Sequence, residues 1–226
     1  MNLRHFAVGV SILFMIGAVS AQTPAGVTTS NANETINTGD PGNVTTEAGA
    51  VSQVDISQDT LTEKWAGFYG TVSGNLVLGD ASGNNFYSWT ANDFSSSKVI
   101  AVPGGSEAPS AIASVSDPNT FLGTGFDTGT DDAANTYNYT GTVSLSGNSA
   151  SNTALAKTYD QNGQSFFDTY LVENTNDGST DAPAYIAQGV SEQTGFDGET
   201  SVNYQMIVGV GEDSSEERFE FYLELG

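Results

Sequence analysis

Apolar and polar residues alternate along several stretches of this chain, a period-2 pattern that is typical of β-strands with one buried face. The most regular stretch is 218–225, where phenylalanine or leucine takes every second position from Phe219 to Leu225, with glutamate or tyrosine between them. We expect so regular a strand at the end of the chain to be paired in a sheet. The pattern predicts further strands at 51–57, 98–102, 137–145, 184–188 and 201–210, and leaves 111–115 open between a strand and one helical turn that Asp117-Pro118 ends.

Two segments have the pattern of β-hairpins. In Thr62–Trp89, two runs of aromatic and β-branched residues flank a turn cluster at Gly79–Asn85. Val72, Leu76 and Leu78 fall on one face of this segment, and we expect that face to be buried. The second hairpin is predicted at 153–173, around the tight-turn sequence Asp-Gln-Asn-Gly at 160–163.

Short strands separated by turn clusters, without a convincing amphipathic helix, indicate an all-β fold of the β-sandwich class, because each apolar sheet face needs a second sheet to cover it. The N-terminal residues 1–21 have the charged start, apolar core and small-residue cleavage site of a signal peptide. Residues 22–48, rich in Thr, Asn, Gly and Ala, are predicted to be a flexible leader or stalk, and 49–226 a single β-sandwich domain. No transmembrane segment is predicted in the mature chain.

The net charge of the chain limits which kinds of molecule it can bind. The chain has 27 acidic and five basic residues. All the acidic residues and four of the basic ones follow the predicted cleavage site, so the mature chain has a net charge of 4 − 27 = −23. Such a protein repels nucleic acid and anionic lipid. Its self-repulsion is screened in concentrated salt, which favours a salt-adapted protein; an ordinary acidic secreted protein is the alternative.

Missing residue types exclude much chemistry. The chain has no cysteine, and its one histidine, His5, lies in the predicted signal peptide. Ser-His-Asp and Cys-His catalysis, zinc sites and haem or iron–sulfur ligation therefore lack their residues, and no nucleotide-binding glycine motif is present. Carboxylate chemistry and the binding of hard cations by oxygen remain.

The densest acidic segment is 127–132, whose carboxylates Asp127, Asp131 and Asp132 are candidate ligands for Ca²⁺, although the spacing is not that of an EF-hand. A solvated acidic loop is the alternative. Three Asn-X-Thr sequences, at Asn33, Asn43 and Asn138, are candidate glycosylation sites.

Four aromatic residues in the first predicted hairpin invite a second binding hypothesis. Trp65, Tyr69, Tyr87 and Trp89 can form a stacking platform for sugars on one sheet face. Packing in the core and between neighbouring strands is the plainer explanation.

The block WAGFYGTVSGNLVLGDASGNNFYSW at 65–89 resembles the signature of a largely uncharacterised family of archaeal secreted or cell-surface proteins. The segments GFDG at 195–198, YQMIV at 204–208 and FEFYL at 219–223 extend the resemblance over the whole body. The resemblance implies location and lineage, and it implies no catalytic residue.

These observations favour a non-catalytic extracellular structural or adhesive protein, secreted or held at the surface of an archaeal cell. Its expected partners are cell-surface components or further copies of itself. A carbohydrate-binding module with glycan partners is the alternative, and a secreted hydrolase that uses carboxylates is the third hypothesis.

Overall fold

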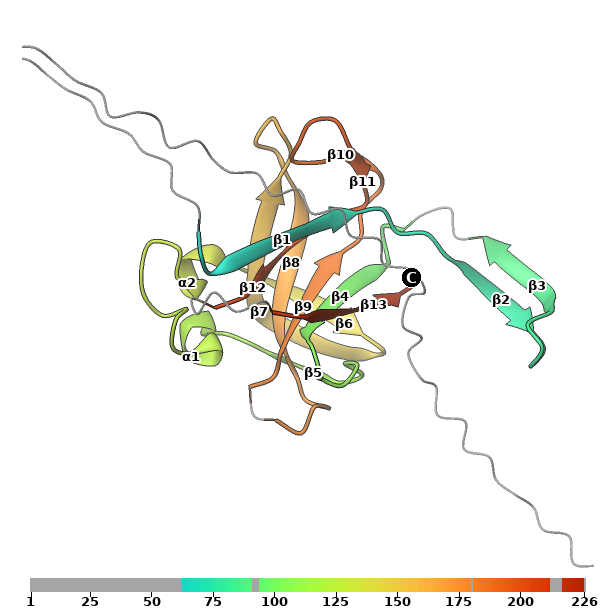
Figure 1. Cartoon of the computed structure of the whole chain (residues 1–226), viewed down its shortest axis with the longest axis horizontal. Coiled ribbons are helices and arrows are strands. Elements are labelled where there is room, and N and C mark those ends of the chain that lie inside the picture. The colour runs from blue at the N-terminus through green and yellow to red at the C-terminus, as the bar shows by residue number, and fades with distance from the viewer. Residues whose placement is uncertain (1–61, 91–93, 180, 212–216, 226) are drawn as a thin grey trace, which may run out of the picture.

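The computed structural model describes residues 62–90, 94–179, 181–211 and 217–225 (Figure 1). This part of the chain is mostly β-structure, so the predicted all-β class is confirmed. The strands are β1 (Trp65–Gly70), β2 (Asn75–Gly79), β3 (Asn85–Thr90), β4 (Lys98–Pro103), β5 (Ile112–Ser114), β6 (Tyr139–Leu145), β7 (Asn148–Tyr159), β8 (Ser165–Asn174), β9 (Pro183–Gln188), β10 (Gln193–Thr194), β11 (Ser201–Val202), β12 (Tyr204–Gly209) and β13 (Phe219–Glu224). Two short helices, α1 (Pro118–Leu122) and α2 (Ala133–Thr136), interrupt them.

The main sheet is antiparallel, with the strand order β13-β4-β9-β8-β7-β6, and β5 pairs with the end of β8. The predicted hairpin at 153–173 is confirmed as β7 and β8. Its turn is closed by the Asp160 carboxylate, which accepts hydrogen bonds from the backbone N–H groups of Asn162 and Gln164, while Gly163 adopts a φ of 73°.

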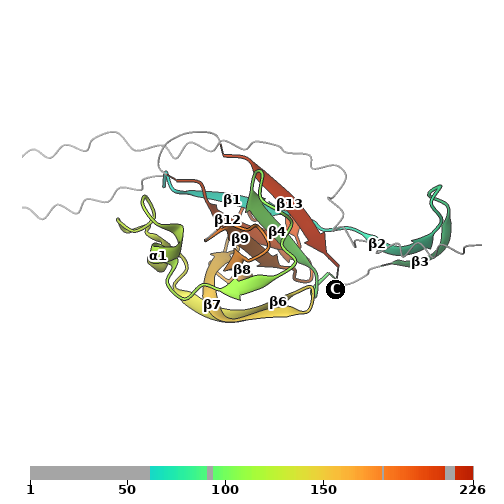
Figure 2. The ribbon, with the colours of Figure 1, turned by 90° about the horizontal axis from the view of Figure 1, so that it is seen from below.

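A second layer formed by β1 and β12 covers one face of this sheet (Figure 2). Phe68 on β1 packs edge-on against Phe219 and Phe221 of β13, at centroid distances of 5.9 and 5.0 Å. The core between the layers contains, among others, Val99, Ala101, Leu171, Tyr185, Met206 and Val208. The arrangement is the sandwich that the alternating pattern predicts.

The opposite face of the sheet has a core of its own, because the sheet curls so that β6 and β7 pass beneath β8 and β9 (Figure 2). This second core contains Ile100, Val102, Val143, Leu145, Val172, Ile186 and Tyr222. The backbone N–H of Ser146, in the β6–β7 turn, donates to the Glu224 carboxylate of β13 at 2.7 Å. The two ends of the strand order are therefore joined.

The predicted pairing of the C-terminal strand is confirmed, because β13 pairs with β4 from Phe219 opposite Pro103 to Glu224 opposite Lys98. The strand is covered on both faces: its phenylalanines meet β1, and Tyr222 lies in the second core.

The first predicted hairpin needs correction. β1 does not pair with its neighbours in sequence; it pairs with β12, with Trp65 opposite Gly209, and only β2 and β3 form a local hairpin. Val72 is buried as predicted, but Leu76 and Leu78 are 62% and 52% exposed. The physical reason is that β2 and β3 extend away from the body in both views, so that no second layer covers them (Figures 1 and 2).

Two other predicted segments are found with changed bounds. Residues 111–115 contain a strand, β5. Asp117 then begins a helix, since its carboxylate caps α1 by accepting from the N–H of Thr120. Tyr137 ends α2, and the strand expected from 137 starts at Tyr139. The strand predicted at 51–57 lies outside the described residues. Among those residues, no helix has the length and apolar character needed to cross a membrane.

Candidate functional site

The most exposed apolar surface is on the hairpin of β2 and β3, residues 75–90, which we call the arm. The register pairs Leu76 with Trp89 and Leu78 with Tyr87, so these four side chains share one side, which we call the apolar face. Leu76 is 62% exposed and Trp89 49%. The tyrosine and tryptophan rings lie 4.6 Å apart between centroids.

The turn of the arm is held by one carboxylate. Asp80 accepts hydrogen bonds from the N–H groups of Ser82 and Asn84 and from the Asn84 side chain. These bonds, with that from the Asn84 side chain the largest, lower the pKa of Asp80, which keeps it ionised. The arm is therefore closed by its own polar groups, independently of the body.

The composition of the arm is opposite to that of the chain as a whole. Asp80 is its one charged residue, in a chain with a net charge of −22. A two-stranded hairpin alone is marginally stable, and exposed apolar patches of this kind mark surfaces that bind other molecules. Interfaces favour Tyr, Trp and Phe and have few charged residues at their centre. The arm has this composition.

The four aromatic residues proposed as a sugar platform are not brought together. Trp65 is buried, packs against Phe126 at 5.2 Å, and donates its indole N–H to the carbonyl of Asp131. Tyr69, farther along β1, contacts Phe196 at 4.9 Å. Only Tyr87 and Trp89 lie side by side, on the arm.

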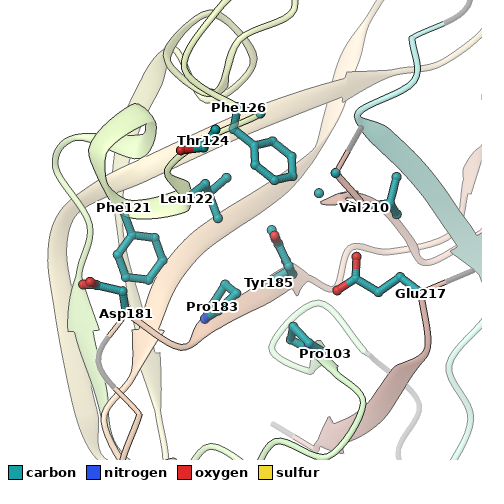
Figure 3. A pocket seen from close by; sticks show the side chains of 13 residues that line it. Pro103, Phe121, Leu122, Thr124, Phe126, Asp181, Pro183, Tyr185, Val210 and Glu217 are labelled. Carbon is teal, nitrogen blue, oxygen red and sulfur yellow. The ribbon is translucent and has the colours of Figure 1, made fainter. Parts of the chain in front are cut away.

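A pocket lies at the other end of the body, where α1, the end of β12 and the segment before β13 meet (Figure 3). We call it the end pocket, and its volume is about 640 Å³. Its apolar walls include Pro103, Phe121, Leu122, Phe126, Pro183 and Val210. Two carboxylate side chains, Asp181 and Glu217, also line it, and the described lining contains no lysine or arginine.

Tyr185 lies at the base of the end pocket (Figure 3). Burial raises the pKa of this phenol well above its usual range, with a smaller contribution from the charge of Glu217. Its hydroxyl is neutral and meets the backbone of Gly209, where an added Cβ would lie 3.0 Å from it. This pocket has no signal in the sequence, because its residues come from distant segments without a shared pattern.

The candidate calcium ligands have separate roles in the structure. Asp131 accepts a hydrogen bond from Thr62 at 2.5 Å and lies 3.4 Å from the Lys64 ammonium. The Asp132 carboxylate caps α2 by accepting from the N–H of Asn135. Asp127 is exposed. The described residues contain no group of three or more acidic or histidine side chains placed to hold a metal, and Ca²⁺ binding stays a prediction that calorimetry can test.

The Asp131–Lys64 pair predicts a pH-dependent stability. The Thr62 hydrogen bond, and next to it the charge of Lys64, lowers the pKa of Asp131 below 3.8. Ionised Asp131 therefore stabilises the fold at neutral pH, and this contribution is lost as pH falls through the lowered pKa, below about pH 4. Because the Asp131 side chain is 37% exposed and solvent screens the pair, we expect Asp131→Asn to lower the free energy of unfolding at pH 7 by about 0.5–1 kcal/mol.

Urea titrations at pH 7 and pH 3 measure this effect. The control is Asp127→Asn, an exposed residue in the same loop with the same change in charge, which we expect to alter stability by less than about 0.5 kcal/mol. Equal losses in both variants would contradict the role given to the Lys64 pair.

Of the candidate glycosylation sites, Asn138 is exposed immediately before β6, whereas Asn33 and Asn43 lie outside the described residues. Comparison with protein-family models, curated proteins and solved structures gives no match for this chain. The archaeal resemblance accordingly stays a prediction.

Proposed function

We propose that this protein is a non-catalytic extracellular structural protein that assembles or adheres through the apolar face of the arm. The observation that carries the proposal is the exposure of Leu76, Leu78, Tyr87 and Trp89 on one side of a hairpin that leaves the body. In a monomer surrounded by water, the exposed apolar side chains of this surface would contribute nothing to stability. Burial against a partner removes it from water.

Charge supports the same function. Two bodies with a large excess of carboxylates repel each other, and contact through them is unfavourable without cations. The arm extends a nearly uncharged surface beyond the body, where two molecules can meet with least repulsion (Figure 1). The predicted signal peptide, the acidic composition and the resemblance to archaeal surface proteins support the proposal that this assembly forms at a cell surface in a salty habitat.

A carbohydrate-binding function is the alternative, and the neighbouring rings of Tyr87 and Trp89 favour it. Their planes are inclined by 60°, so they do not form one flat platform for a sugar. A glycan array separates the two functions: binding that depends on both rings would support the alternative.

The test of the proposed function is the double variant Tyr87→Ser/Trp89→Ser. We expect the native protein to form larger species in about 1 M NaCl, where the repulsion is screened, and the double variant to remain monomeric with an unchanged melting temperature. The control is Val77→Ser, which removes an exposed apolar side chain from the opposite face of β2. Sedimentation velocity measures assembly. A monomeric native protein that also fails to bind cell envelopes would contradict the proposal.

A further inference from the structure

We propose that the arm of one copy binds in the end pocket of a second copy, so that the molecules join head to tail. This inference rests on the proposed function, in which the arm mediates assembly, and it names the surface that receives the arm. The partner is a second copy of this chain.

The two surfaces have complementary chemistry. The apolar face supplies two aromatic rings and two leucines, and the end pocket supplies the phenylalanine, leucine, valine and proline walls that exclude water from such groups. Tyr87 and Trp89 each carry a hydrogen-bond donor with no partner among the described residues. Asp181 supplies a carboxylate acceptor in the pocket. The hydrogen-bond donors and the rings of the arm therefore match the acceptor and the apolar walls of the end pocket.

The pocket also selects against other occupants. It contains two carboxylates and no basic residue among its described lining, so it disfavours anionic ligands and the acidic surface of another body. The arm, with Asp80 as its one charged residue, is the part of a second copy that meets these conditions. The volume of the end pocket, about 640 Å³, is in the range of pockets that hold several large side chains or a small ligand.

The positions of the two surfaces determine the form of the assembly. Trp65, at the start of β1, packs against Phe126 of the end pocket, whereas Gly74, between β1 and β2, lies against Leu225 where the arm leaves the body. The six residues of β1 therefore separate them by roughly 20 Å. Both views show α1 and the arm at opposite ends of the molecule (Figures 1 and 2). A contact between two different surfaces is heterologous, so each added copy leaves one arm and one pocket unused, and assembly continues beyond the dimer as an open chain or, where the rotation between copies closes, as a ring.

The test uses three variants that each lose one surface. Tyr87→Ser/Trp89→Ser removes the arm's binding face and leaves the end pocket intact. Thr124→Arg places a long side chain in the end pocket, which Thr124 lines from an exposed position, and leaves the arm intact. The control is Thr130→Arg, the same substitution at an exposed position outside the pocket. Thr124→Trp fills the pocket without adding charge. The melting temperature of each variant checks that it is folded.

We expect the native protein and Thr130→Arg to form species that grow beyond the dimer as concentration rises. The arm variant alone and each Thr124 variant alone should remain monomeric. An equimolar mixture of the arm variant with either Thr124 variant should form a one-to-one dimer and nothing larger, because it contains one intact arm and one intact pocket per pair.

Three results would overturn the inference while leaving the proposed function in place. The first is a Thr124 variant that assembles as the native protein does. The second is a native assembly that stops at the dimer, as expected if two arms pair with each other. The third is a mixture that stays monomeric. A native protein that is monomeric throughout and binds no cell envelope overturns the proposed function as well.

Discussion

Leu171→Ala is expected to lower the free energy of unfolding by about 2–5 kcal/mol, whereas Leu76→Ala should change it by less than about 0.5 kcal/mol. Both substitutions remove the same atoms from a leucine in a β-strand. Leu171 is fully buried in the core between the main sheet and the β1–β12 layer, and its removal leaves a cavity. Leu76 is exposed on the arm, so that its truncation removes little buried area.

Urea unfolding of the two variants at low protein concentration measures this contrast in the monomer. The slope of the transition should be the same for both, because neither changes the surface exposed on unfolding by much. A Leu76→Ala loss close to that of Leu171→Ala would mean that the apolar face is covered within one molecule, which would contradict the proposed function. At high concentration, Leu76→Ala should weaken assembly instead.

The contrast between these leucines also explains what the sequence can predict. Period-2 alternation sets which residues share a face, and it correctly placed the β7–β8 hairpin, β9, β12 and β13. It cannot tell whether another layer covers that face. Val143 and Leu76 sit in similar alternating runs, yet Val143 lies in the second core because the sheet curls over it. Leu76 is left exposed because β2 and β3 pair only with each other among the described strands.

Pairing between strands that are far apart in the sequence is the other feature that the alternating pattern does not predict. The sequence favoured a local partner for β1, but its partner β12 is more than a hundred residues away. The end pocket depends in turn on that pairing, because β12 brings Val210 beside Phe126 and Tyr185. The arm could have been recognised as unusual from its lack of charge in an acidic chain. The exposure of the arm could not have been predicted, because aromatic and aliphatic residues at alternating positions usually indicate a buried face.

The acidic surface leads to the second large effect, an increase in stability with salt. All four basic residues that follow the predicted cleavage site are in ion pairs with an acidic residue: Lys64 with Asp131, Lys98 with Glu224, Lys157 with Asp168, and Arg218 with Glu220. These four basic side chains are therefore already paired with carboxylates. With the predicted signal peptide removed, the net charge is −23, which repels itself most strongly in the compact state, and ions from solution reduce this repulsion.

We expect the melting temperature to rise by about 10 °C between 0.1 and 1 M NaCl, as the Debye length falls from about 10 to about 3 Å. Sucrose at the same osmolality stabilises the protein by exclusion from its surface and does not screen charge. It therefore separates stabilisation by exclusion from stabilisation by screening. The matched variant replaces Asp127, Glu192 and Glu199, which are exposed, with their amides. With three fewer negative charges it should melt higher than the native protein in dilute buffer and respond less to NaCl. A melting temperature that is flat across this range would show that self-repulsion does not limit the stability of the fold, and the salt adaptation inferred from the composition would then be wrong.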